Sequence, residues 1–199
     1  TRGVLMKQAG EISPGGMAAI LGLDIPVLEK VCAEASTAEE IVQVANDNCP
    51  GQVVISGASA ALDRALPLAQ QAGARRAVRL AVSIAAHSPL MLHAQADFNR
   101  AVDAAPIQDP RIPLVGNVTA APLATAAQIR ADLQAQLTHR VRWTETIQHF
   151  AAQGVTHYLE LGSGSVLVGL VRRIHREGVG LTLGTPGEFE KLAEILRAA

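Results

Sequence analysis

Short apolar runs alternate with segments of helical period along the whole chain. Apolar runs of about four to eight residues bounded by turn residues are typical of strands, and apolar residues spaced three and four apart are typical of helices. The first part of the chain therefore predicts the order strand, helix, strand, strand, helix, strand, over residues 16–23, 26–36, 41–45, 52–56, 59–71 and 77–82. This β-α-β-β-α-β order is typical of a ferredoxin-like α+β unit.

The remaining segments predict a different arrangement. Strands are expected at residues 112–117 and 156–161, and helices at residues 89–102, 125–136, 143–153, 166–175 and 186–197. Strands that alternate with helices indicate a parallel sheet covered on both faces. We therefore predict an α/β protein. Residues 1–16 and 81–199 would form a large parallel-sheet subdomain, and residues 17–80 a small ferredoxin-like α+β subdomain inserted into it.

One histidine stands out because of its place in this pattern. His87 follows a predicted buried strand at residues 78–84 and precedes Pro89. Strand ends at the rim of a sheet are common positions for reactive side chains in α/β proteins. A neutral imidazole accepts a proton through one nitrogen while the other nitrogen orients the ring. The alternative is a histidine that only caps a turn.

Composition and charge narrow the function classes. A formal net charge of −1 argues against nucleic acid or an anionic membrane as the main partner. No apolar run approaches the roughly 20 residues that a membrane span needs. The two cysteines, Cys32 and Cys49, have neither metal-ligand spacing nor the pattern of a disulfide framework. We therefore expect a cytoplasmic protein without a metal or cofactor of its own.

Six segments in a fixed order carry a family resemblance. They are Gly16–Leu23, Ala45–Gly57, Val82–Met91, Asn117-Val118, Val141-Arg142-Trp143 and Glu160–Leu167. Together they resemble the malonyl-CoA:acyl-carrier-protein transacylase family, which includes the acyltransferase domains of polyketide synthases. The resemblance implies a hydrolase-like large subdomain. It also implies transfer of malonyl from coenzyme A, through an acyl-serine, to the phosphopantetheine thiol of acyl carrier protein, for fatty acid or polyketide synthesis.

The resemblance also assigns residues. His87 matches the base that activates the serine, and Gln136 matches the residue whose main-chain oxygen orients that base. Arg2 matches the arginine that binds the malonyl carboxylate, for which a guanidinium offers two parallel donors. Asn48 and Gln52 match polar positions near the acyl pocket. Taken alone, Arg2 could equally be a solvated side chain, Gln136 a helix-end residue, and Asn48 a turn residue before Pro-Gly.

The family's serine elbow, Gly-His-Ser-x-Gly, is not among these 199 residues. The resemblance thus implies that the chain begins just after the elbow helix, that the N-terminal strands of the large subdomain are missing, and that this chain alone is nearly inactive. Residues 162–165, Gly-Ser-Gly-Ser, imitate an elbow or a phosphate cradle, but their spacing favours a tight strand-to-helix turn. Their backbone amides could still help to position a ligand.

Two positions depart from the family pattern. Ala86 stands where many malonyl-selective members have Phe or Ser, which leaves room for a substituted malonyl group. Ser163 replaces the proline usual in the Gly-Pro-Gly loop. Two other function classes stay open: a non-catalytic module that binds the carrier protein, and a nucleotide-binding α/β protein. The sequence argues against the nucleotide-binding class, because no Gly-x-Gly-x-x-Gly follows a first strand.

A basic cluster near the C-terminus bears on partners. It consists of Arg172, Arg173, His175 and Arg176 at the end of a predicted helix. Such residues interact favourably with the helix dipole and with water. They would also suit an acidic carrier protein or the phosphates of coenzyme A.

Overall fold

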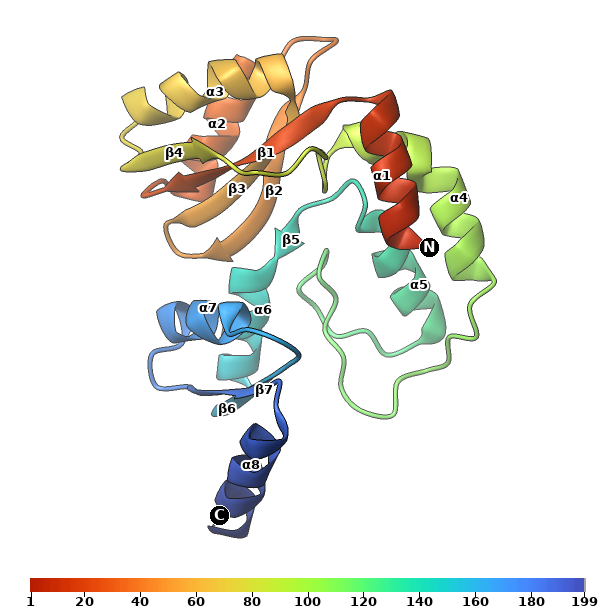
Figure 1. The fold of residues 1–199 in the computed structure, drawn as a ribbon, viewed down its shortest axis with the longest axis vertical. Coiled ribbons are helices and arrows are strands. Elements are labelled where there is room, and N and C mark those ends of the chain that lie inside the picture. Colours follow the sequence, from red (N-terminus) through yellow and green to blue (C-terminus); the bar gives the residue numbers. More distant parts are fainter. Residues whose placement is uncertain (199) are drawn as a thin grey trace. The chain divides into compact units, whose positions relative to one another are not determined.

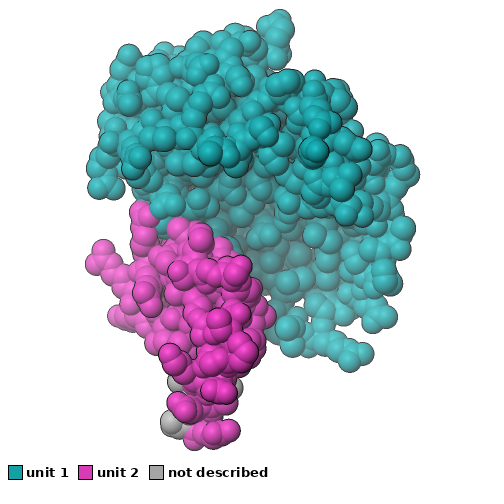
Figure 2. All heavy atoms as spheres, viewed as in Figure 1, with its two compact units in different colours: residues 1–146 teal, residues 147–199 magenta. Residues whose placement is uncertain are grey.

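The computed structural model describes residues 1–198 and has an α/β fold (Figure 1). The chain divides into two compact units, residues 1–146 and residues 147–199 (Figure 2). The strands are β1 Gly15–Leu21, β2 Val42–Cys49, β3 Gln52–Ala58, β4 Arg76–Arg79, β5 Val141–Arg142, β6 His157–Leu161 and β7 Val179–Leu183. The α-helices are α1 Arg2–Ile12, α2 Ile25–Ala35, α3 Ser59–Gln71, α4 Leu92–Asp103, α5 Ala126–Ala135, α6 Trp143–Ala152, α7 Val166–Ile174 and α8 Pro186–Ala198, and a single 3₁₀ turn, η1, spans Pro89–Met91.

A five-stranded sheet organises the first unit. Its strand order is β4-β1-β3-β2-β5; β1 pairs antiparallel with β3 and β4, β2 pairs antiparallel with β3, and β2 pairs parallel with β5. Side chains in β1 alternate between buried and half-buried positions, as the period of two predicts for a sheet with one covered face. The predicted order of strands and helices over residues 16–82 is therefore present, although several boundaries differ.

Both α2 and α3 pack on the same face of this sheet (Figure 1). Ile20 from β1, Ile55 from β3, Leu28 from α2 and Leu62 from α3 are fully buried in one hydrophobic cluster. Many of the smaller members of the cluster are alanines. Small side chains let the helices approach the sheet closely, which is how a chain with few aromatic residues fills a core.

The β2–β3 hairpin differs from its prediction. Residues 46–49 belong to β2 rather than to a turn, and only Pro50 and Gly51 connect the two strands. Gly51 has φ +71, a conformation that favours glycine. The register between β2 and β3 shifts at Ala45 and again at Asn48, so each is an extra residue at a bulge.

A second hydrophobic cluster lies under α1 and α4. Met6 and Ala9 from α1 pack with Phe98 from α4, with Met91 from η1 and with Leu137 after α5. The same cluster includes Ala86, the residue before His87. Helical packing thus holds the segment that carries the histidine.

One predicted strand is absent and another ends earlier than predicted. Residues 112–117 form only an isolated bridge between Val115 and Pro122, because this apolar stretch has no neighbouring strand with which to form a ladder. The predicted buried strand at residues 78–84 ends at Arg79, and residues 80–83 are exposed. His87 therefore lies in a loop and not at a strand end. The predicted division into subdomains follows a different line from the two compact units and stays a prediction.

The second unit contains a two-stranded parallel sheet, β6–β7, and the helices α7 and α8. Residues 162–165 form the turn between β6 and α7, and Gly162 (φ +125) and Gly164 (φ +95) adopt conformations that favour glycine. Glu160 accepts hydrogen bonds from the main-chain nitrogens of Leu167 (3.1 Å) and Val168 (2.8 Å) at the start of α7. Those amides are thus already used by a carboxylate of the chain. Within residues 1–198, the helices are too short or too polar to cross a bilayer.

Candidate functional site

His87 lies in the loop between β4 and η1, in a conformation that is rare for a residue other than glycine. Its φ is +59, in the left-handed region. Ser88 is fully buried; its Oγ donates to the main-chain oxygen of Ala85 (2.7 Å) and accepts from the main-chain nitrogen of Leu90 (3.3 Å). The loop is therefore closed around His87 by a side chain that caps η1.

The His87 ring is oriented by a main-chain carbonyl. Its Nδ1 lies 2.7 Å from the oxygen of Gln136, which is the C-cap residue of α5. Because a carbonyl oxygen only accepts hydrogen bonds, Nδ1 carries the proton and donates to it. The neutral ring then presents Nε2 as the nitrogen that accepts a proton. The two residues predicted as base and orienter are thus hydrogen-bonded to each other.

The surroundings of His87 favour its neutral form. Burial is the main cause that lowers its pKa below the ordinary value. The hydrogen bond to the Gln136 carbonyl raises the pKa in part, and the positive charge of Arg2 lowers it again. The net shift is downward, so the imidazole is uncharged near neutral pH and is able to act as a base.

Arg2 is close enough to His87 for its charge to act on the ring. It is the first residue of α1 and is half-buried, and burial lowers the pKa of its guanidinium. Its Nε is buried and makes no hydrogen bond within residues 1–198. A buried donor without a partner is costly unless a ligand satisfies it, so Arg2 is suited to bind an anionic group near His87.

Asn48 and Gln52 lie elsewhere on the sheet. Gln52 opens β3, and its Oε1 accepts a weak hydrogen bond from the Cys49 sulfur (3.9 Å). Asn48 is half-buried at the bulge near the end of β2. Gln43 of β2 contacts His87, and Asn48 lies further along the strand, beyond the bulge at Ala45. The roles predicted for Asn48 and Gln52 stay predictions.

Sequence patterns did not point to Gln43 or Asp132, yet both hold this region together. Gln43 donates to main-chain oxygens of His87 and of Thr138. Asp132, on α5, is 7% exposed and accepts hydrogen bonds from three successive main-chain nitrogens, those of residues 117, 118 and 119. A polar residue within an amphipathic strand or helix carries no signal of such long-range contacts, so only the fold identifies them.

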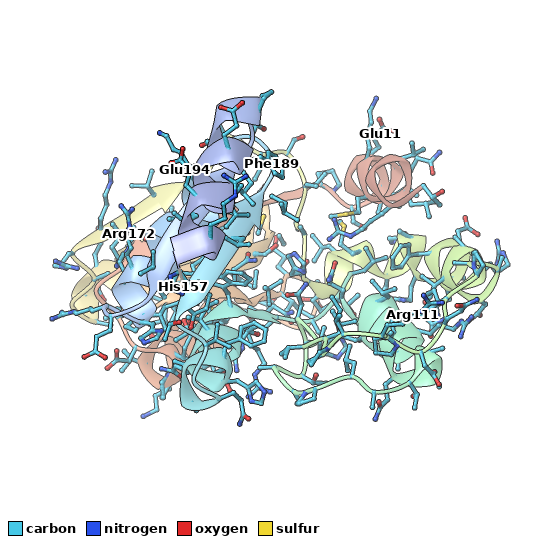
Figure 3. All side chains as sticks on the ribbon, turned by 90° about the horizontal axis from the view of Figure 1, so that it is seen from below. Glu11, Arg111, His157, Arg172, Phe189 and Glu194 are labelled. Carbon is cyan, nitrogen blue, oxygen red and sulfur yellow. The ribbon has the colours of Figure 1, made fainter. Side chains whose placement is uncertain are left out.

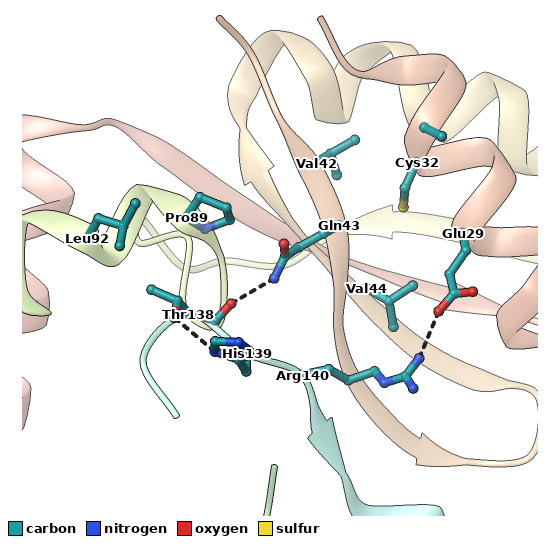
Figure 4. A pocket seen from close by; sticks show the side chains of 11 residues that line it. Glu29, Cys32, Val42, Gln43, Val44, Pro89, Leu92, Thr138, His139 and Arg140 are labelled. Atoms are coloured by element: carbon teal, nitrogen blue, oxygen red, sulfur yellow. Dashed lines mark hydrogen bonds and ion pairs between the residues drawn. The ribbon is translucent and has the colours of Figure 1, made fainter. Parts of the chain in front are cut away.

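A cavity of about 610 Å³ adjoins these contacts (Figure 4). Gln43 and Thr138 line it on one side, and the ion pair between Arg140 and Glu29 (3.1 Å) lies on another. Cys32 also lines it; burial, and secondarily the charge of Glu29, raises the pKa of this thiol to about 12. Cys32 is therefore an unreactive thiol at neutral pH.

The chain therefore has an α/β fold in which a histidine oriented by a main-chain carbonyl lies near a half-buried arginine. The chain belongs to the acyl transferase domain family, whose model matches residues 1–186.

Individual relatives agree with this family. The chain is 38% identical over 196 residues to the malonyl CoA-acyl carrier protein transacylase of Bacillus subtilis, and 39% identical over 195 residues to that of Haemophilus influenzae. In each case the match covers 98% of this chain and 62% of the relative. The chain thus spans about three fifths of the length of these curated relatives.

Solved structures show the same similarity. The malonyl-CoA:acyl carrier protein transacylase of Xanthomonas oryzae pv. oryzae superposes with a TM-score of 0.91 at 41% identity, over 98% of this chain and 62% of that chain. The structure of a type II polyketide synthase acyl-carrier protein in complex with its malonyl-transacylase matches with a TM-score of 0.90 at 37% identity. This match covers 97% of this chain and 62% of that chain.

Proposed function

We propose that this chain is part of an [acyl-carrier-protein] S-malonyltransferase, which transfers malonyl from coenzyme A to acyl carrier protein for fatty acid or polyketide synthesis. The observation that carries the proposal is the 2.7 Å contact between His87 Nδ1 and the Gln136 oxygen, near Arg2, whose buried Nε has no hydrogen-bond partner within residues 1–198. A base and an anion-binding group at one place are what malonyl transfer to a serine requires.

The proposed reaction has two steps. His87 Nε2 removes the proton of a serine hydroxyl, the serine oxygen forms a bond to the malonyl thioester carbon, and the bond from that carbon to the sulfur of coenzyme A breaks. The proton passes from His87 to the departing sulfur. In the second step the phosphopantetheine thiol loses its proton to His87 and attacks the acyl-serine, and the serine oxygen leaves with that proton. The Gln136 carbonyl stabilises the imidazolium in both steps.

Arg2 would select the acyl group. Its guanidinium would donate to the malonyl carboxylate and satisfy the buried Nε. An acetyl group would leave that donor and its charge unpaired, which disfavours acetyl transfer. Asn48 and Gln52 would contribute polar groups near the acyl pocket, and the small side chain of Ala86 would leave room for a substituent on the malonyl group.

The finer fold assignment also belongs to this proposal. We assign residues 17–80 to a ferredoxin-like small subdomain, and residues 1–16 and 81–199 to a hydrolase-like large subdomain. The order β4-β1-β3-β2 with antiparallel neighbours, and two helices on one face, supports the first assignment. The helices α1 and α4, which pack together in a separate cluster, support the second.

Acyl carrier protein is the proposed macromolecular partner, and the cytoplasm the proposed compartment. The basic cluster at the end of α7 would assist docking of an acidic carrier protein, because Arg172 (labelled in Figure 3) and Arg173 are exposed. His175 has a different contact, since its Nδ1 lies 3.0 Å from the hydroxyl of Tyr158.

The nucleophile is the critical test. We propose that the serine belongs to sequence outside these 199 residues, because they contain no Gly-x-Ser-x-Gly elbow. Intact-mass spectrometry after incubation with malonyl-CoA should show no adduct on this chain, and one malonyl adduct on a chain extended upstream in its natural reading frame to include such an elbow.

Each other result changes the assignment. A stable adduct on the 199-residue chain would mean that one of its own serines is the nucleophile. Absence of an adduct on both chains would favour the second candidate function, a non-catalytic module that binds the carrier protein; the missing elbow is the observation that keeps this candidate open. Binding of acyl carrier protein to the same two chains, measured by titration calorimetry, would then decide it.

A further inference from the structure

Gln43 reaches from the sheet to two segments that are far from it in the sequence. Its Nε2 donates one hydrogen bond to the main-chain oxygen of His87 (2.8 Å) and one to the main-chain oxygen of Thr138 (2.9 Å). Figure 4 shows its side chain extending from β2 toward Thr138. A primary amide has two N–H donors, so both are used.

The first of these bonds acts on the backbone of His87. That residue has φ +59, a conformation that persists only where the surrounding structure holds it. Ser88 closes the loop on one side through Ala85 and Leu90. Gln43 holds the carbonyl of His87 itself, so it fixes the peptide plane that follows the imidazole-bearing residue.

The second bond acts on the group that orients the ring. Thr138 comes two residues after Gln136, whose carbonyl oxygen accepts the hydrogen bond from His87 Nδ1 at 2.7 Å. The intervening residue, Leu137, is fully buried, which ties Gln136 and Thr138 to the same rigid turn. One amide group therefore connects the backbone that carries the ring with the turn that carries its hydrogen-bond acceptor.

We propose that Gln43 is a positioning residue for acyl transfer, which sets the distance between the His87 ring and the Gln136 carbonyl and so keeps the proton on Nδ1 and the lone pair on Nε2. Its role in acyl transfer rests on the proposed function, whereas its effect on the distance between the His87 ring and the Gln136 carbonyl does not. Gln43 does not contact the reacting atoms in this arrangement; it acts through His87.

Gln95 offers a matched control. It is also a half-buried glutamine that uses Nε2 twice, toward Asn99 Oδ1 (2.6 Å) and the main-chain oxygen of Gln134 (2.7 Å). It therefore ties α4 to α5 with the same chemistry but contacts neither His87 nor Thr138 through these bonds. Loss of Gln95 reports what the loss of such an amide at the end of α5 does when the bonds to His87 and Thr138 are kept.

The experiment is ¹⁵N–¹H NMR of the histidine rings in the 199-residue chain, with the His87 signals identified from the His87→Asn variant. Gln43→Met keeps the length of the side chain and removes both donors. We expect the single Nδ1–H tautomer of His87 to become a mixture, and exchange of its Nδ1 proton with water to accelerate on the order of tenfold, the factor for about one net hydrogen bond. In Gln95→Met the His87 tautomer and the exchange rate of its Nδ1 proton should remain as in the parent chain.

The outcome does not depend on malonyl transfer, so failure of this proposal and failure of the proposed function are distinguishable. An unchanged tautomer and exchange rate in Gln43→Met would overturn the proposal, as would equal changes in both variants. If Gln43→Met does not fold, Gln43→Glu at neutral pH removes the donors with less change in shape. Unfolding of both Gln43 variants beside a folded Gln95→Met would also overturn it, because Gln43 would then be structural only.

Discussion

The sheet with α2 and α3 differs from the His87 region, which comprises residues 80–92 and 114–140, in what holds it together. The sheet combines strand ladders with a cluster of aliphatic side chains and alanines, in which many residues contribute small amounts. The His87 region has no ladder beyond an isolated bridge; it combines the hydrophobic cluster under α1 and α4 with a few polar side chains, chiefly Gln43, Ser88 and Asp132. Loss of any one side chain should therefore leave the sheet folded, whereas loss of a single polar contact should change the geometry around His87.

The sharpest test of this difference is His87→Asn. Asparagine tolerates a positive φ, so the loop should keep its shape while the base is lost. In the chain extended to include the elbow, the rate of malonyl adduct formation should fall about 10²–10⁴-fold, with little change in thermal stability. The measurement is time-resolved intact-mass spectrometry.

His139→Asn is the control for that variant. His139 is exposed and close to Gln136 in the chain, and its Nδ1 lies within hydrogen-bond distance of Thr138 Oγ1 and of the main-chain oxygen of Ala135. Its adduct rate should equal that of the parent. Equal losses in both histidine variants would show that His87 is not the base.

The sheet core should respond in stability and not in site geometry. Ile55 is fully buried in the cluster under α2 and α3, so Ile55→Ala should lower the free energy of unfolding by about 2–5 kcal/mol. Denaturant unfolding measures this loss, and the His87 ring signals should stay in place at temperatures where the variant is folded. A shift of those signals would mean that the two regions are coupled more tightly than their separate hydrophobic clusters indicate.

Asp132→Asn tests the polar supports of the site. One carboxylate accepts three main-chain N–H groups of residues 117–119 through its two oxygens, and asparagine would replace one of these acceptors by an NH₂ donor that faces an N–H group. We expect a loss of about 1–3 kcal/mol in the free energy of unfolding. Asp109→Asn is the control, since that carboxylate is exposed and accepts from only one main-chain nitrogen, that of Ala126, in the recorded bonds. A loss no larger than that of the control would contradict the prediction.

The smallest expected effect is the pH dependence of stability. The pKa of His87 is lowered in the folded state, mainly by burial, so the folded chain binds this proton less readily than the unfolded chain. The contribution of His87 is fully present above its ordinary pKa of 6.5 and is lost as the pH falls through the folded value. Between pH 7.5 and 5 the parent should lose more stability than His87→Asn in thermal unfolding. Parallel curves would show that burial of His87 does not oppose its protonation.

Much of the sheet could be predicted because its signals are local. The helix at residues 59–71 has the predicted bounds, and the strands at 16–23 and 52–56 differ from β1 and β3 by only one or two residues. Residues 112–117 have a similar apolar content but form no strand, because a ladder needs a neighbour that the fold does not supply there. The strand β7 was not predicted at all, although it forms a regular parallel pair with β6.

The sequence by itself determined the order of helices and strands over residues 16–82 and the family resemblance. The pairing of His87 with Gln136 followed from that resemblance, through matching motif positions. Only the tertiary structure decided that His87 lies in a loop with positive φ, that Arg2 Nε is buried with no hydrogen-bond partner among residues 1–198, and that Gln43 bonds both to the backbone of His87 and to the turn after Gln136. The physical reason is the sequence separation over which each kind of interaction acts. Periodicity and turn chemistry act over neighbouring residues, whereas a hydrogen bond across 44 or 95 positions leaves no pattern in a single sequence.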